Sequence, residues 1–174
     1  IDRVAFRADL AEAQIACRGG ELERAGECLR RARSMLETSG HAAVTLHTEH
    51  HASWISACVE LALAGARYAE ALKLSTTALT HARRAGRARM QIEFYLWQAL
   101  ARQGMENAPA ADKAIGAALA LAAPAGVVYP FLAAGAGLSA LLRNHAGAHS
   151  AFARRIGQTL GQRHSAPAPA AAAR

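Results

Sequence analysis

The sequence predicts an all-α protein, a right-handed superhelix of stacked helical hairpins that ends in a pair of capping helices. Three observations lead to this fold class. Hydrophobic residues make up 52% of the 174 residues but aromatic residues only 5%, and alanine, the best helix former, supplies much of the hydrophobic content. A pattern of small residues recurs along the chain, and proline and glycine interrupt a long uncharged segment near its C-terminal end.

The recurring pattern is an alanine, a second residue four positions later and another alanine three positions after that. Spacings of four and three keep these residues on one face of a helix, and small side chains there let two helices approach closely. The three copies are Ala25, Leu29 and Ala32; Ala71, Ser75 and Ala78; and Ala111, Ile115 and Ala118, so the pattern returns after two similar intervals. The alternative is a plain helix bundle in which this spacing is accidental.

A second helical stretch precedes each copy, so the repeating unit is a helix, a tight turn and a helix. We expect residues 1–163 to form one repeat domain. The end of the chain, "SAPAPAAAAR", is too poor in bulky apolar residues to bury a core, so residues 164–174 are expected to be a linker or a disordered tail. The predicted helices are 3–18, 21–38, 43–64, 68–85, 88–103, 109–122, 137–145 and 149–162.

Residues 114–142 carry no charged side chain, and a run of this length is what a membrane span needs. Pro124 and Pro130 break the run, because proline inside a helix removes a hydrogen bond and clashes with the preceding turn. We therefore expect a buried connection and no membrane span. The connection is predicted as a helix, a turn, a short extended "VVYPF", a glycine-rich turn and a second helix from Leu138.

This connection is expected to close the stack of hairpins, because a solenoid must cover its terminal hydrophobic face. Its apolar residues take three roles in the prediction. Leu119 and Leu121 finish the last hairpin, Phe131 and Leu132 cover its end, and Leu138, Leu141 and Leu142 begin the capping helix.

The N-terminal residues "IDRVAFRADLAEA" are charged throughout and do not resemble a signal peptide. Three cysteines, Cys17, Cys28 and Cys58, are an odd number without paired spacing, so we expect buried free thiols in a reducing compartment. Both observations favour a cytoplasmic protein. Because the chain starts at Ile1, we also expect it to be a fragment of something longer.

The net charge is +7, which raises the question of nucleic-acid binding. The densest basic segment, "HARRAGRARM", has a structural explanation, because cations at the end of a helix offset its dipole and glycine then ends the helix. No aromatic residues alternate with these arginines to stack on bases. We expect no direct binding of DNA by this chain.

The histidines and serines do not form a recognisable catalytic or metal site. His47, His50 and His51 lie on one predicted helix, but a pair of histidines without a third ligand is a weak metal signal, so we expect them to face solvent. No serine lies in a glycine elbow. The sequence therefore predicts neither an enzyme nor a metal or cofactor site.

Binding of a ligand or partner is the class of function that the sequence still allows. If the first helix of each hairpin lines the concave face of the stack, polar residues counted back from each repeat alanine gather there and suit a small-molecule effector or a protein partner. A solvated inner face without a ligand is the alternative. The candidate residues are Arg7, Gln14, Arg18, Ser53, Ser56, Glu60 and Glu93, interspersed with Leu10, Leu96 and Leu100.

The hairpins resemble tetratricopeptide repeats (TPRs). "GELERA" has the turn glycine, the bulky Leu22 and the small Ala25 of that repeat, and "ARYAEA" has Tyr68 and Ala71. The units depart from the repeat by being longer than its roughly 34 residues, and no proline ends the second helix.

The last unit resembles the regulatory region of MalT-like, large ATP-binding LuxR-type transcriptional regulators, whose final repeat runs "AL.LA.P.G..RPFL..G..L..LL". Tyr129 departs from this pattern, because the family often has arginine there. The matching residues are Ala118, Leu119, Leu121, Ala122, Pro124, Gly126, Pro130, Phe131, Leu132, Gly135, Leu138, Leu141 and Leu142.

The resemblance implies a module of a bacterial cytoplasmic regulator that senses an effector, binds protein partners and self-associates. It further implies an ATPase domain and a DNA-binding helix-turn-helix domain elsewhere in the protein. This chain has neither: it lacks a P-loop, and no DNA-reading helix follows residue 163. The alternative function is a general TPR scaffold for protein–protein interaction without a small-molecule ligand.

Overall fold

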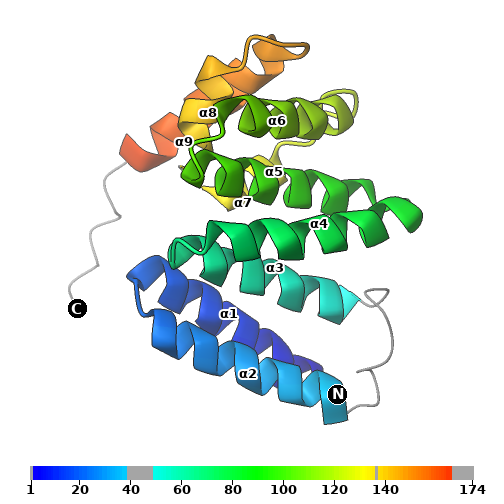
Figure 1. The fold of residues 1–174 in the computed structure, drawn as a ribbon, viewed down its shortest axis with the longest axis vertical. Coiled ribbons are helices and arrows are strands. Elements are labelled where there is room, and N and C mark those ends of the chain that lie inside the picture. Colours follow the sequence, from blue (N-terminus) through cyan, green and yellow to red (C-terminus); the bar gives the residue numbers. More distant parts are fainter. Residues whose placement is uncertain (1, 39–48, 136, 166–174) are drawn as a thin grey trace, which may run out of the picture.

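The computed structural model describes residues 2–38, 49–135 and 137–165, and over these ranges the protein is helical with no β-strand (Figure 1). The all-α prediction is confirmed. The helices are α1 (Arg3–Gly19), α2 (Leu22–Thr38), α3 (Glu49–Ala64), α4 (Tyr68–Arg84), α5 (Ala88–Gly104), α6 (Ala108–Ala122), α7 (Tyr129–Ala134), α8 (Leu138–Asn144) and α9 (Ser150–Ser165).

The first six helices form three hairpins, α1–α2, α3–α4 and α5–α6, which stack in chain order (Figure 1). The first helix of each later hairpin packs on the hairpin before it: α3 contacts both α1 and α2, and α5 contacts α3 and α4. At the C-terminal end α7 packs on α5, α8 on α6, and α9 on α8 and α7. This arrangement is the predicted solenoid with its cap.

The repeated triplets lie where the helices touch. Ala25, Ala71 and Ala111 each have no exposed surface, and the other six triplet residues are at most 5% exposed. Ser75 is the polar member, and its hydroxyl donates to the carbonyl of Ala71 at 2.7 Å, which satisfies the hydroxyl inside the core. The alternative of an accidental spacing is therefore wrong.

Five connections between successive helices share one turn geometry. In each, a residue with positive φ follows the helix, and the next N–H donates to a carbonyl five positions earlier, at 2.7–3.0 Å. This is the hydrogen bond of the Schellman motif, which satisfies a carbonyl that the end of a helix leaves free. The positive-φ residues are Gly20, Ala66, Gly86, Glu106 and Gly126.

The core is divided into three clusters, and each is completed by the helices that follow the hairpin. Trp54 and Ala57 of α3 pack into the cluster of the first hairpin, where the indole N–H of Trp54 donates to the carbonyl of Leu29 at 3.1 Å. Phe94 and Trp97 of α5 do the same in the second cluster. Each hairpin thus depends on its neighbour to bury its apolar face.

The expected extended segment "VVYPF" is wrong, because Tyr129–Ala134 forms the short helix α7. Pro130 is its second residue, where proline is tolerated because the N–H that it lacks would have no partner within the helix. Phe131 is fully buried and meets Phe152 of α9 edge to face, with ring centroids 6.4 Å apart. Phe131 therefore covers the end of the stack, as predicted.

The other residues of the predicted closure divide into two groups. Leu119, Leu138 and Leu142 are fully buried, and Leu132 and Leu141 pack against the same cluster. Leu121 was expected to finish the last hairpin but is 36% exposed. It follows Leu119 by two positions, and two residues turn a helix by about 200°, so the two side chains point to opposite sides of α6.

The observed helix bounds agree closely with the predicted ones, with two differences. Helix α7 was missed. The predicted helix 43–64 is described over Glu49–Ala64, and residues 43–48 lie outside the described part of the chain. Helix α9 runs to Ser165, beyond the predicted end of the domain at residue 163. Most of the predicted tail, residues 166–174, also lies outside the described ranges, so the domain division remains a prediction.

Among the described residues, no helix has the length and apolar character that crossing a membrane requires.

Close packing at the hairpin turns can be tested at Gly104. A Cβ atom there would lie 2.3 Å from the ring of Tyr68 at the start of α4. We expect Gly104→Ala to lower the free energy of unfolding by about 1 kcal/mol, because an overpacking cost of ~1–3 kcal/mol exceeds the ~1 kcal/mol that alanine gains in a helix. Urea unfolding followed by circular dichroism measures the change.

Gly26→Ala is the matched control, since the nearest side-chain atoms to its Cβ would be 3.6 and 3.9 Å away, at ordinary contact distance. That variant should be as stable as the wild type or more stable. Adding Tyr68→Leu should restore part of the loss in Gly104→Ala. If the two glycine variants behave alike, Tyr68 does not limit the packing.

The turn geometry can be tested at Ala66, which has a φ of 54°. Left-handed backbone costs an L-residue about 1 kcal/mol but costs glycine little, so Ala66→Gly should leave stability unchanged or raise it by up to ~1 kcal/mol. The same substitution at Ala11, exposed in the middle of α1, should lower stability by about 1 kcal/mol. Losses of equal size at both sites would contradict the proposed strain.

Candidate binding groove

The first helices of the hairpins and α7 line one groove of about 840 Å³. Its walls come from α1, α3, α5 and α7, the helices that the repeat geometry places on the same side of the stack. Of the seven candidate residues, the structure brings six together in this groove: Arg7, Gln14, Ser53, Ser56, Glu60 and Glu93.

The seventh candidate, Arg18, lies in an adjoining pocket of about 680 Å³ together with Leu100. Glu60, Trp97 and Tyr129 line both cavities, so the two are neighbouring parts of one concave surface. We call the two cavities together the concave groove. Leu10 and Leu96 also line it, as expected.

Two half-buried carboxylates, those of Glu60 and Glu93, line the concave groove. The side-chain amide of Gln14 donates to Glu60 Oε1 at 3.1 Å and so links α1 to α3. Burial raises the pKa of Glu60; the bond from Gln14 and the charge of Arg18 oppose this rise, and the carboxylate of Glu93 adds to it. The charged form of Glu60 is therefore destabilised relative to its protonated form.

Glu93 of α5 is in the same situation. Its side chain is 26% exposed, and Arg89 Nε lies 3.6 Å from its Oε1. Burial raises the pKa of Glu93, while the neighbouring charge and hydrogen bond of Arg89 partly oppose the shift. A bound cation or hydrogen-bond donor would relieve the cost of both buried carboxylates.

Two aromatic side chains, Trp97 and Tyr129, also line the concave groove. The guanidinium of Arg89 lies 5.5 Å from the ring centroid of Tyr129, which is 64% exposed. Trp97 is only 8% exposed, and its indole N–H has no acceptor among the described residues. Buried donors are rarely left unpaired, so Trp97 has bonding capacity that the described side chains do not use.

Trp97, Tyr129 and Arg89 were not among the predicted site residues. The spacing of the repeats could have identified Tyr129. The number of residues between Ala71 and Ala111 also separates Arg89 of α5 from Tyr129. Helix α7 thus takes the place of the first helix of a further unit, which the expectation of an extended segment obscured. Trp97 lies one position away from the predicted Leu96.

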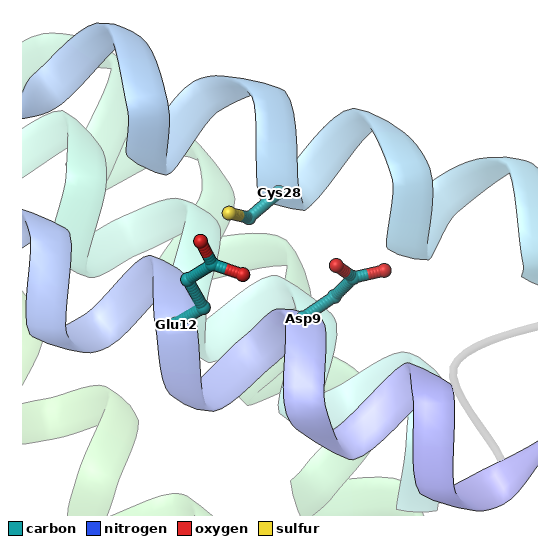
Figure 2. Close-up of side chains that lie close together, drawn as sticks. All are labelled: Asp9, Glu12 and Cys28. Carbon is teal, nitrogen blue, oxygen red and sulfur yellow. The ribbon is translucent and has the colours of Figure 1, made fainter.

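A second cluster of potential ligand atoms joins α1 to α2 on another part of the molecule. Asp9 and Glu12 of α1 face Cys28 of α2, and their ligand atoms lie within 4.8 Å of one another (Figure 2). Arg31 already binds this cluster, at 2.6 Å from Asp9, 3.4 Å from Glu12 and 3.3 Å from the sulfur. A metal ion would have to displace that guanidinium.

Arg24 binds the same cluster from a second side, with its Nη2 at 2.9 Å from Glu12 Oε1. The bond from Arg24 lowers the pKa of Glu12, against the raising effect of burial. Two arginines thus balance two carboxylates, of which only Asp9 is nearly buried, at 10% side-chain exposure. The cluster fastens the two helices of the first hairpin.

The expected solvent-facing histidines are only partly accessible. The ring of His50 lies edge-on to Phe6 at 5.5 Å and that of His51 edge-on to Trp54 at 5.7 Å, and both residues are half-buried. His50 meets Phe6 of α1 across the contact between the first two hairpins, whereas His51 and Trp54 both belong to α3. His47 lies outside the described residues.

His145 makes polar contacts that were not predicted from the sequence. It is 6% exposed, and its Nδ1 lies 2.6 Å from a carboxylate oxygen of Asp112, which belongs to α6. Its other ring nitrogen lies 3.2 Å from the carbonyl of Ala148. His145 therefore ties the cap to α6.

The three cysteines are free thiols, as expected, but only Cys28 is fully buried. Cys17 and Cys58 are half-buried. Burial raises the pKa of Cys17, and it raises that of Cys58 to about 12. These shifts keep both sulfurs protonated at neutral pH, so neither is an activated nucleophile.

The buried carboxylates predict a pH dependence of stability. Their pKa values are raised in the folded state, so the folded protein binds more protons than the unfolded chain above pH 4.5, and stability falls as the pH rises through the folded pKa values. Glu60→Gln/Glu93→Gln removes this loss. Relative to wild type, the double variant should gain stability between pH 4.5 and neutral pH, as measured by urea unfolding.

Glu70→Gln provides the control, because Glu70 is 50% exposed and lies in a surface salt bridge with Arg67. That variant has no burial cost to relieve, so it should show no such gain. A pH-independent difference for the groove double variant would contradict the desolvation of Glu60 and Glu93.

Comparison with known proteins places the chain in a family. No curated protein and no solved structure matches it. A family model described as the MalT-like TPR region matches residues 42–147, which is more than half of the 174-residue chain. The matched region runs from the second hairpin through α8, and on this match the chain belongs to the MalT-like TPR region family.

Proposed function

We propose that the chain is the effector-sensing and protein-interaction module of a bacterial LuxR-type transcriptional regulator, and that ligands bind in the concave groove. The observation that carries this proposal is the groove itself. Three successive hairpins bring Gln14, Glu60 and Glu93 to one surface, although each of these residues belongs to a different hairpin. Membership of the family supports the regulatory role.

The side chains of the groove define the chemistry of the ligand. Glu60 and Glu93 accept hydrogen bonds or a positive charge. The exposed ring of Tyr129 adds an apolar surface at one end. A small polar molecule with hydroxyl or amino groups would satisfy these residues together.

In this proposal ligand binding changes how the module associates with itself or with other domains of the regulator. Helices α1, α3 and α5 belong to three different hairpins, so a ligand that contacts all three would stiffen their arrangement. DNA contact would come from a helix-turn-helix domain outside these residues, and the whole regulator would act in the cytoplasm.

The second candidate function is a scaffold that binds a protein segment and no small molecule. The continuity of the concave groove from α1 to α7 favours it, because an extended peptide could follow the full length of this surface. Both candidates use the same residues and differ in the size of the occupant.

The proposed site is tested by screening the purified protein against small polar metabolites and against a peptide library, with thermal unfolding as the readout. A ligand that binds the folded state raises the unfolding temperature. Glu60→Gln and Glu93→Gln should each weaken the affinity of such a ligand by about tenfold, because each removes a charge-assisted hydrogen bond worth ~1.5 kcal/mol. Glu70→Gln, on the outer side of α4, should leave it unchanged.

Ligands from the metabolite set would support sensing, and ligands found only among peptides would support the scaffold. In the complete regulator, the same two variants should shift the dose dependence of effector-driven transcription. Ligands that bind wild type and both groove variants equally would place binding elsewhere and reject the concave groove as the site.

A further inference from the structure

The concave groove carries more positive than negative charge. Taken over both of its cavities, the charged residues that line it are four arginines and two glutamates. No aspartate, lysine or histidine among the described residues lines either cavity, so two positive charges are left over. The arginines are Arg7, Arg18, Arg87 and Arg89, and the glutamates are Glu60 and Glu93.

Helix α2, which does not line the groove, has its positive charges neutralised. Each of its four arginines forms an ion pair with a carboxylate within the first hairpin. Asp9 and Glu12, the two carboxylates of α1, serve two of these arginines, and Figure 2 shows both side chains directed toward α2. The carboxylates of α1 are therefore used outside the groove.

The side of α1 that lines the groove is cationic. Arg7, Ala11, Gln14 and Arg18 follow one another at intervals of four, three and four residues, which places them on one side of the helix. Neither arginine forms an ion pair with a described carboxylate, although the charge of Arg18 acts on Glu60 from farther away. Two of the four arginines of the groove therefore lack a close counterion within the described chain.

Arg89 of α5 is paired only loosely. Its Nε lies 3.6 Å from Glu93 Oε1, and its side chain remains 68% exposed. This distance is longer than the roughly 2.7–2.9 Å of a strong charge-assisted hydrogen bond. Because a guanidinium has several N–H donors, one long contact leaves Arg89 able to bind a further acceptor.

The two glutamates do not cancel the positive charge. Burial raises the pKa of both Glu60 and Glu93, so their charged forms are destabilised, and the hydrogen bond to Glu60 comes from the neutral amide of Gln14. A hydroxyl or amino group of a ligand would relieve this cost by donating a hydrogen bond. A ligand that brought only positive charge would also meet the repulsion of four arginines.

We propose that the ligand of the concave groove is a small organic anion, with a carboxylate or phosphate group for the arginines and hydroxyl or amino groups for Glu60 and Glu93. This inference rests on the proposed function of the groove and adds the charge of the ligand to it. Guanidinium groups bind carboxylate and phosphate alike through two parallel N–H donors. A dianion would balance the surplus of two positive charges.

The surplus disfavours two other classes of ligand that the glutamates alone would admit. A polyamine would be repelled by the arginines, and a neutral molecule would leave their charge uncompensated. The size of the main cavity, about 840 Å³, lies in the range of small-molecule sites. The groove is therefore suited to a compact, polar and negatively charged ligand.

The charge class is tested by isothermal titration calorimetry of the 174-residue chain with four probes of similar size. Glycerol phosphate and tartrate are hydroxylated anions, glycerol is neutral, and diaminopropanol is a cation. Sodium chloride holds the ionic strength constant, because salt screens charge. We expect an anion to bind at least about tenfold more tightly than glycerol or diaminopropanol, and the tighter anion identifies the acidic group.

Arginine variants locate the bound anion. Arg7→Gln and Arg89→Gln should each weaken its affinity by about tenfold, because each removes a charged donor. Arg7→Lys keeps the charge but loses the parallel donors, so it should restore only part of the affinity. Arg30→Gln is the matched control, because Arg30 is an exposed arginine of α2 that lies 3.9 Å from Glu27, and this variant should bind as wild type does.

Three results overturn the proposal. The first is tighter binding of the neutral or the cationic probe, which leaves the groove as the site if Glu60→Gln and Glu93→Gln weaken that binding. The second is anion binding that Arg7→Gln and Arg89→Gln leave unchanged, because the anion then lies elsewhere on this basic protein. The third is the absence of binding by both anions. The proposed function fails separately, when screened ligands bind wild type and the two glutamate variants equally.

Discussion

Close contact between helix backbones is the constraint on which the rest of this structure depends. Two helices can approach closely only where side chains are small, and the alanines of the repeated triplet occupy the middle of each contact with at most 1% of their surface exposed. Larger apolar residues next to them, such as Leu29 and Ile115, then fill the space at the edges of the contact. A bulky residue in place of Ala71 would push α4 away and disturb every hairpin after it.

The concave groove is a consequence of this stacking. When each first helix packs on the preceding hairpin through the same face, its adjacent face turns to the same side of the molecule in every unit. Gln14, Glu60 and Glu93 are therefore brought together by the backbone geometry of the repeats, with the bond from Gln14 to Glu60 as the one direct link among them within the described residues. Their partial burial makes the carboxylates costly, as is common for groups in binding sites.

The two ends of the stack differ in how much of their apolar surface is buried. At the C-terminal end Phe131, Leu138 and Leu142 are fully buried beneath the cap, and the contact of His145 with Asp112 fastens it. At the N-terminal end Val4 and Ile15 are exposed. The stacking that covers each hairpin with the next also forms the concave groove, so the covered faces and the groove are two results of a single repeating interface.

The sequence by itself determined every described helix except α7, as well as the order and the buried face of these helices, because these features depend on residues within four positions of one another. The alanine triplets, the turn at Gly86 and the concave positions of Glu60 and Glu93 all follow from such local periodicity. Membership of the MalT-like TPR region family is likewise read from the sequence, because the family model matches more than half of the chain.

Only the tertiary structure decided the features that depend on distant partners. Residues 129–134 became a helix because Phe131 is buried against α9 as well as the last hairpin. The pairing of Arg31 with Asp9, the contact of His145 with Asp112 and the half-buried state of His50 each join separate helices. Side chains this far apart in the chain come together only after the hairpins have stacked, because their positions depend on the packing of whole helices and not on local backbone preference.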